Sequence, residues 1–515
     1  MLASSIDAAT LLSALASSAL IYTISLVIYR LTLHPLAKYP GPFLAKICDL
    51  DNFYHVCRGD RHTNFFYCHE KYGPVYRYGP NRLSFNTANA LHDIHGHKAN
   101  VQKARLYSAF VRGTAVSTLT CVDKVRHAQK RRVISHAFSE RALKSMEQYV
   151  LEPIREFCTI LQQSGGKEAL NMDDWDTYLL FDIMGALAFG RSFKLLTSSE
   201  NRYVPEVMHT GTIFGNINGN ALWAHYTGIS NLLMPQGNAD RKAFRAYAQK
   251  EARDRMALGA EGTDRKDFFH YLIEAKDPQT GEGFTLSDLW SEANLILTAG
   301  SDTSSTVMSG TFFYLTHNPT ILATVTREVR DAFAGGQVED IVSGSKLNSC
   351  VYLRACLDES MRISPPVPGP LPREVCAGGA MIDGIMVPAG IDVSVGTWAI
   401  HHNKDYYPSP HTYNPSRWIA SDSIPASAGY AGVARADVEK AQRAFAAFSL
   451  GPRGCIGRNM AYLELTLAMA RVLFLFDLEL ASTLGEGGPG GEWMTWDHFN
   501  AYKEGPVLRF LPRKV

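Results

Sequence analysis

The hydrophobic and polar positions divide the chain into three parts. Residues 8–29 carry no charge and are mostly apolar, and about 20 such residues can cross a bilayer as a helix. From about residue 124 to residue 363, apolar positions recur with the period of an amphipathic helix. Beyond residue 363, proline and glycine interrupt the pattern and leave room only for short strands. The pattern predicts a mainly α fold with small β-sheets, preceded by one transmembrane helix.

One predicted helix, from about Leu286 to Tyr314, is longer than the others. Thr285 and Asp288 form a capping box at its start, and Asn318-Pro319 ends it. One face is too polar for a second membrane span, so we expect this helix to cross the body of a helical domain. The other predicted helices are Ser139–Gln162, Asp173–Ala188, Asp240–Met256, Asp267–Glu274 and Arg458–Phe474, and the predicted strands are Val75–Tyr78, Arg82–Phe85, Met381–Val387 and Asp392–Val395.

The apolar segment near the N-terminus has two interpretations, a membrane anchor and a cleaved signal peptide. A signal peptide would explain the small residues 14–19, but no Lys or Arg precedes the apolar run, and the run continues past them. The first positive charges, Arg30 and Lys38, follow the run, and the positive-inside rule then places the rest of the chain in the cytosol. We therefore expect a membrane anchor at 1–30, a proline-containing hinge at 31–44 and one catalytic domain at 45–515.

Composition excludes several functions. The 51 Lys and Arg residues nearly balance the 50 Asp and Glu residues, so a net charge of +1 does not favour a nucleic-acid partner. The nine cysteines are odd in number and contain no C-x-x-C pair, which argues against both a zinc site of the usual cysteine spacing and a disulfide scaffold.

The strongest chemical signal is the segment FSLGPRGCIG at residues 448–457. Cys455 immediately precedes a helix predicted to begin near 456–457, and the N-terminus of a helix stabilises a thiolate. The glycines at 451, 454 and 457 let the backbone approach the sulfur and direct N–H groups at it. The alternative is a buried structural cysteine beside a glycine turn.

The complete pattern F-x-x-G-x-R-x-C-x-G resembles the cytochrome P450 superfamily. That resemblance implies a haem b cofactor whose iron is bound by the thiolate of Cys455. It further implies that Arg453 meets a haem propionate, that Phe448 covers the sulfur side, and that Gly457 belongs to the same cofactor-binding loop. The fold implied is the cytochrome P450 fold.

Other motifs follow in the order that this family shows. Ala299-Gly300-Ser301-Asp302-Thr303 lies inside the long helix, where the glycine would let a flat ligand or dioxygen approach the backbone. The Thr303 hydroxyl could bond the Ala299 carbonyl and kink the helix. In the family, the equivalent acid–alcohol pair delivers protons during oxygen activation, so Asp302 and Thr303 are the predicted catalytic residues. We expect Asp302 to exchange protons with solvent.

The remaining motifs concern structural support and the propionates. Glu359 and Arg362 form an E-x-x-R pair on one helix face, which in the family is buried and joined by an arginine, here Arg417. The segment around Arg417 departs from the family because Ser416 replaces a glutamate.

Three further side chains resemble family positions that bind a propionate. His127 and Arg131 match a W-x-x-x-R motif in which histidine replaces tryptophan, and Arg373 matches a third position of this kind.

The resemblance implies a monooxygenase that inserts one atom of O₂ into an apolar small molecule. The electrons would come from NADPH–cytochrome P450 reductase, which would dock near Cys455. Residues 8–29 would hold the protein in the endoplasmic reticulum membrane by a single pass, and the chain is most similar to fungal members that act in secondary metabolism. The segments expected to line the substrate pocket are 98–120, 205–235, Leu295, Ala299, Val367–Pro370 and Phe499.

Three rival functions remain open. The first is a haem-thiolate isomerase or dehydratase that needs no reductase, although the Asp302–Thr303 pair argues against it. The second is a non-catalytic haem-binding or gas-sensing protein. The third is a helical membrane scaffold without haem.

Overall fold

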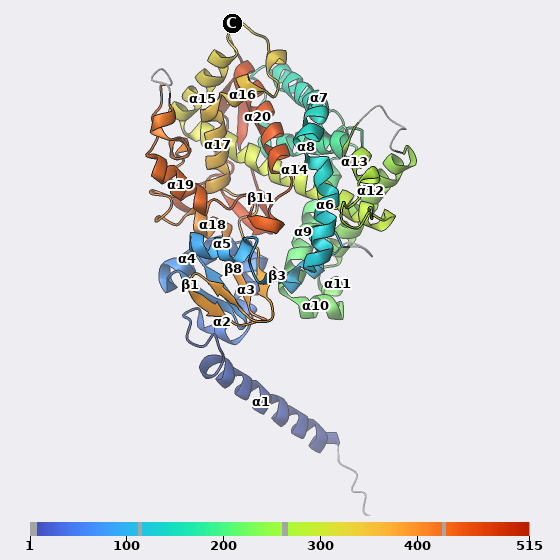
Figure 1. The fold of residues 1–515 in the computed structure, drawn as a ribbon, viewed down its shortest axis with the longest axis vertical. Coiled ribbons are helices and arrows are strands. Elements are labelled where there is room, and N and C mark those ends of the chain that lie inside the picture. The colour runs from blue at the N-terminus through green and yellow to red at the C-terminus, as the bar shows by residue number, and fades with distance from the viewer. Residues whose placement is uncertain (1–7, 112–115, 260–265, 425–428, 514–515) are drawn as a thin grey trace, which may run out of the picture.

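A long central helix organises the fold, and other helices pack around it above a five-stranded sheet (Figure 1). The computed structural model describes residues 8–111, 116–259, 266–424 and 429–513. Its α-helices are α1 Ala8–Thr32, α2 Phe43–Ile47, α3 Leu50–Arg58, α4 Arg61–Tyr72, α5 Ala88–His95, α6 Lys124–Ser135, α7 Glu140–Ser164, α8 Met172–Ala188, α9 Tyr203–Asn220, α10 Leu222–Thr227, α11 Ile229–Leu233, α12 Pro235–Ala257, α13 Phe268–Glu274, α14 Leu286–His317, α15 Pro319–Ala332, α16 Ser345–Asn348, α17 Val351–Ile363, α18 Thr397–His401, α19 Arg435–Ala444 and α20 Arg458–Leu475. The strands are β1 Val75–Gly79, β2 Arg82–Phe85, β3 Val101–Lys103, β4 Leu170–Asn171, β5 Arg373–Val375, β6 Ala380–Ile382, β7 Ile385–Val387, β8 Asp392–Val395, β9 Phe476–Leu480, β10 Thr495–His498, β11 Asn500–Lys503 and β12 Val507–Pro512.

The central helix is α14, and its start is the one predicted from sequence. The Thr285 side chain accepts from the backbone N–H of Asp288, and the Asp288 carboxylate accepts from the Thr285 N–H in return. The helix continues three residues beyond the predicted end, and Pro319 then opens α15. The predicted helices within residues 139–274 correspond to α7, α8, α12 and α13, which confirms the periodicity.

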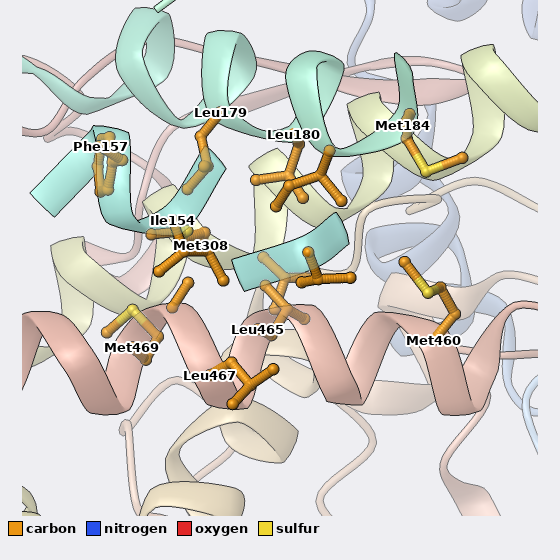
Figure 2. Close-up of a cluster of buried hydrophobic side chains, with 14 of the residues drawn as sticks. Ile154, Phe157, Leu179, Leu180, Met184, Met308, Met460, Leu465, Leu467 and Met469 are labelled. Carbon is orange, nitrogen blue, oxygen red and sulfur yellow. The ribbon is translucent and has the colours of Figure 1, made fainter. Parts of the chain in front are cut away.

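The core of the helical body forms where α7, α8, α14 and α20 meet (Figure 2). Ile154, Leu180, Met308 and Leu465 come from these four helices, and each is at most 1% exposed. Burying one such side chain contributes roughly 1.5–3 kcal/mol relative to leaving it in water. This packing fixes α14 and α20, the two helices that carry the predicted chemistry.

The largest sheet has the strand order β1-β2-β8-β5-β3. Strands β2 and β8 run parallel, and the other neighbours are antiparallel. The register of β3 and β5 pairs Lys103 with Arg373, so two cationic side chains leave the sheet at one place. A second sheet has the order β4-β12-β9, and two hairpins, β6-β7 and β10-β11, complete the β-structure described here.

Helix α1 differs from the other long helices because none of its residues is buried. Its length and mean hydropathy of 2.0 suffice to cross a membrane. It leaves the body at the end where α2 and β1 lie (Figure 1). After α1 the chain turns at Gly41, where any side chain would collide with the Arg77 carbonyl oxygen, so only glycine fits this exit.

Candidate active site

The segment that holds Cys455 is a tight loop leading into α20. The backbone N–H of Cys455 donates to the Phe448 carbonyl over 2.8 Å, which closes the loop. Gly451 has φ +61°, and a side chain there would collide with the His95 carbonyl oxygen. Gly457 is the N-cap of α20, so the helix begins at Arg458, the start of the predicted helix Arg458–Phe474, and not already near 456–457. The loop therefore places Cys455 just before the positive end of a helix.

The thiol of Cys455 experiences opposing electrostatic effects. Burial raises its pKa, whereas the backbone N–H groups of Gly457 and Arg458 and the charge of Arg131 lower it. Cys455 is nevertheless an exposed residue. A sulfur in this position, with N–H donors aimed at it, suits a thiolate bound to a cation.

A cluster of basic side chains lies beside the cysteine loop. It contains four of the side chains predicted from sequence, together with one that was not, and its members are Lys103, His127, Arg131, Arg373 and Arg453. Burial, followed by repulsion from Arg453, Lys103, Arg131 and Arg373, lowers the pKa of His127 to about 3. Burial, followed by repulsion from Arg373, lowers the pKa of Arg453 to about 10. Mutual repulsion of this kind favours an anionic group between these side chains, and two haem propionates fit that requirement.

Two members of the cluster are fixed by contacts with the cysteine loop and its neighbours. Arg131 donates from Nη1 to the Gly454 carbonyl over 2.9 Å. Arg453 donates to the Cys121 carbonyl over 2.6 Å and to the Val122 carbonyl over 2.9 Å. The structure thus brings together the predicted residues of α6, β5 and the cysteine loop.

Lys103 and Tyr107 lie in the predicted pocket segment 98–120, but sequence reasoning did not place them beside the propionate-binding residues. Lys103 is 5% exposed, its ammonium donates to the Leu119 carbonyl, and burial holds the pKa of that ammonium well below its usual range. The Tyr107 hydroxyl accepts from Arg373 over 3.2 Å. In β3, residues 101 and 103 are buried and residue 102 is less so, which shows that Lys103 points inward.

On α14, the Thr303 hydroxyl donates to the Ala299 carbonyl over 2.6 Å, as predicted. Ala299 has an exposed side chain although most of this helix is buried, so the helix presents an accessible face at this turn. The expectation for Gly300 was wrong. A Cβ there would lie 2.5 Å from the Met184 sulfur, so this glycine allows α14 to pack against α8 and does not face a ligand.

The expected solvent exchange at Asp302 is also corrected. Asp302 is 8% exposed, and its carboxylate accepts from the Asn500 amide over 2.6 Å. Burial raises the pKa of this carboxyl, while Lys503 and Asn500 lower it. Lys503 also donates to Ser305 over 3.2 Å and forms an ion pair with Asp173 over 3.0 Å. The acid is therefore connected to a polar network of the terminal hairpin, which sequence reasoning did not find.

Aromatic side chains from two predicted pocket segments meet near this network. The ring centroids of Phe110 and Phe499 are 4.8 Å apart, and those of Tyr107 and Phe499 are 6.3 Å apart. A side chain at Gly215 would touch Phe110, so α9 approaches as well. Within the predicted segment 98–120, positions 112–115 lie outside the described residues.

The Glu359–Arg362 pair is completely buried, as expected, with both side chains at 0% exposure. Arg362 forms two hydrogen bonds to the Glu359 carboxylate, and Arg417 adds a third over 3.0 Å. Trp418 and the backbone of Asn414 also donate to this carboxylate, so the absent family glutamate at Ser416 does not leave the triad incomplete.

Comparison with known proteins identifies the family and the fold of this chain. The family model for cytochrome P450 matches residues 35–486. The chain is similar to cytochrome P450 monooxygenase atnE of Emericella nidulans, with 37% identity over 497 residues that cover 94% of each chain. It is also 37% identical over 514 residues to cytochrome P450 monooxygenase AKT7 of Alternaria alternata, covering 96% of each chain. Among solved structures, the cytochrome P450DA heme domain aligns with a TM-score of 0.71 at 18% identity, covering 88% of this chain and 93% of that one.

The chain belongs to the cytochrome P450 family of haem-thiolate enzymes. The cytochrome P450 fold and the haem cofactor expected from sequence are confirmed.

Proposed function

We propose that this protein is a membrane-anchored monooxygenase that inserts one atom of O₂ into an apolar small molecule, with electrons from NADPH delivered by NADPH–cytochrome P450 reductase. The main structural support is the acid–alcohol pair on α14, in which Asp302 is buried and Thr303 lies on the accessible face of the helix. Its sequence support is that the relatives from Emericella nidulans and Alternaria alternata are named monooxygenases.

Residue roles in this proposal follow from the contacts. Cys455 is the iron ligand, and Gly457 stabilises its thiolate through a backbone N–H. His127, Arg131, Arg373 and Arg453, assisted by Lys103, hold the two propionates, because their mutual repulsion is relieved by two negative charges. Phe448 shields the sulfur from water beside the ring of Tyr462, whose centroid lies 5.2 Å away. When bound, haem supplies the site where O₂ is activated.

The protein's part in proton delivery is assigned to Asp302 and Thr303. Burial favours a proton on the Asp302 carboxyl, and the bond from Asn500 keeps this carboxyl oriented. The Thr303 hydroxyl, held against the Ala299 carbonyl, lies on the face of α14 that carries the exposed side chain of Ala299. The Asp302 carboxyl would give its proton to the reacting site and regain one through the network of Lys503 and Asp173, where the Asp173 side chain is 23% exposed.

The substrate class and the cellular location are part of the same proposal. Phe110 and Phe499 supply an apolar contact surface, which suits an apolar metabolite, and the two relatives come from fungi, which supports a role in fungal secondary metabolism. We assign residues 1–30 to a single-pass anchor in the endoplasmic reticulum, residues 31–44 to a hinge and residues 45–515 to a cytosolic catalytic domain. The length and hydropathy of α1 support the anchor.

The test is the ratio of product formed to NADPH consumed, measured with the metabolite that accumulates when the gene is deleted. In Thr303→Ala, haem spectra and substrate binding should persist, while the ratio falls and hydrogen peroxide rises. Thr311→Ala is the matched control, because Thr311 makes the same hydrogen bond to a carbonyl four residues earlier, farther along α14. Turnover without NADPH would replace this proposal with an isomerase or dehydratase. An equal ratio in wild type and Thr303→Ala would remove Thr303 from proton delivery.

A further inference from the structure

Two imidazoles and one carboxylate converge outside the Cys455 site. His402 Nε2 and His411 Nδ1 each lie 2.8 Å from the same oxygen, Oε1 of Glu492. The three potential ligand atoms all lie within 4.8 Å of one another. His402 is 0% exposed and Glu492 is 2% exposed, whereas the His411 side chain is 33% exposed. The cluster is therefore buried on one side and open to solvent on the other.

The hydrogen bonds of His402 determine which of its two ring nitrogens carries the proton. Nδ1 lies 2.8 Å from the Trp398 carbonyl oxygen, which can only accept, so Nδ1 carries a proton. The ring also stacks on the Trp398 ring, with centroids 3.6 Å apart, which fixes its orientation. A neutral imidazole protonated at Nδ1 presents a lone pair from Nε2 to the carboxylate oxygen. Two acceptors at this distance need a cation between them, either a proton or a metal ion.

This arrangement resembles the outer shell of known metal sites. A histidine that binds a metal through one nitrogen usually donates from the other to a backbone carbonyl or a carboxylate, as His402 does to Trp398. Two imidazoles and one carboxylate are a ligand set that zinc accepts, with a water molecule in the fourth position. The exposed side of His411 provides both the entry path and the place for that water.

The loop that carries Glu492 comes close to His411 because two of its positions are glycine. Gly490 has φ +67°, and a Cβ there would lie 2.7 Å from Cβ of His411. At Gly488, a Cβ would lie 2.6 Å from the Glu492 carbonyl oxygen. Neither position tolerates a side chain without movement of the loop. The two glycines therefore allow a segment far along the sequence to bring its carboxylate against the two histidines.

We propose that His402, His411 and Glu492 form a structural binding site for a divalent transition-metal ion, with zinc as the best match. Ligand atoms around tetrahedral zinc are about 3.3 Å apart, from bond lengths of roughly 2.0–2.2 Å. The Glu492 oxygen must then retreat by about 0.5 Å from each nitrogen, which a glycine-flanked loop can accommodate.

Such an ion would link the segment that contains Glu492 to His402, which directly follows α18. The same segment also contacts α14. Trp493 follows Glu492 directly, its backbone N–H donates to the Tyr314 hydroxyl over 3.2 Å, and its ring lies against Gly310 of α14. The same segment continues into the hairpin that carries Asn500. Binding of the metal would therefore stabilise the hairpin that contacts Asp302.

The test uses the purified full-length holoprotein, stripped with a chelator, dialysed and returned to zinc chloride. Equilibrium dialysis with elemental analysis should find one zinc per chain. X-ray absorption at the zinc edge should show nitrogen and oxygen at about 2.0–2.1 Å with imidazole scattering and no sulfur. Zinc should also raise the midpoint of thermal unfolding.

Two variants and one control make the result decisive. His411→Ala and the isosteric Glu492→Gln should bind zinc at least about tenfold more weakly. His97→Ala, which removes an exposed histidine elsewhere, should bind like wild type. Holoprotein spectra establish that each variant is folded. If the wild-type protein takes up no zinc, a proton lies between His402 Nε2 and Glu492 Oε1, and the proposal is wrong. Sulfur ligands, or equal affinity in all variants, would place any bound zinc elsewhere and equally overturn it.

Discussion

The buried carboxylate of Glu359 allows the most quantitative prediction. Glu359→Gln keeps the size and shape of the side chain but removes its negative charge. In the native protein this carboxylate accepts two hydrogen bonds from Arg362, one from Arg417 and one from the indole of Trp418. The substitution leaves two guanidinium groups without a counter-charge at positions that are 0% and 7% exposed.

The expected cost can be bounded from these contacts. Removing one partner of a buried ion pair typically costs about 3–5 kcal/mol, because the remaining charge stays desolvated. The net stability of a protein is only about 5–15 kcal/mol. Because two arginines lose their partner together, we expect a cost in the upper part of the 3–5 kcal/mol range, about 5 kcal/mol. Glu359→Gln should therefore yield little holoprotein and should lose its haem at a markedly lower temperature than wild type.

The assay measures the amount of holoprotein by the carbonyl band of the reduced, thiolate-bound haem, before and after heating. Arg435→Ala is the control, since Arg435 pairs with Asp422 over 2.7 Å and both side chains are more than half exposed. Water and dissolved ions screen an ion pair this exposed, so its loss should cost little stability. If Glu359→Gln and Arg435→Ala lose haem at the same temperature, the argument from burial is refuted.

Three further predictions rest on separate features. Cys455→Ser should abolish the thiolate carbonyl band, and a variant that retains it would show that another residue binds the iron. Removal of residues 1–30 should release the protein from membranes with its haem retained, and protection of the intact protein from protease in microsomes would contradict a cytosolic domain. Burial raises the pKa of Glu464 from 4.5 to about 8. Between pH 4.5 and about pH 8, this side chain is therefore protonated in the native state and ionised in the unfolded state. Stability should fall as the pH rises through that window, by up to about 1.4 kcal/mol per pH unit, and Glu464→Gln should flatten the profile when unfolding is followed at pH 5 and pH 8.

Features encoded by neighbouring residues could be predicted from the sequence. The start of α14 depends on Thr285 and Asp288, which are three positions apart, and the structure has that capping box. The loop around Cys455 is similarly local, because its glycines and the following helix lie within a few residues. Even there, Gly300 was misinterpreted, since a glycine indicates a close approach but does not say whether a ligand or a neighbouring helix approaches.

Contacts between distant segments could not be predicted in the same way. Asn500 reaches Asp302 across 198 positions, and this depends on how the terminal hairpin lies against α14. Lys103 faces Arg373 only because of the register between β3 and β5. A single sequence shows the residue types but not the strand register, and a one-residue shift would turn Lys103 to the other side of the sheet.

The pairing of β12 has a consequence for the order in which this protein folds. Strand β12 is the middle strand of its sheet, and Val507 pairs with Asn171, while Leu508 pairs with Leu170. The sheet can therefore close only after the whole intervening chain has been synthesised. Helices α7 and α8 leave the ribosome before α14, α20 and β12, against which their buried side chains pack, and contacts of such long sequence separation form slowly. During that interval the apolar faces of both helices are open to chaperones and to aggregation, and the pairing of β12 completes the sheet only at the end.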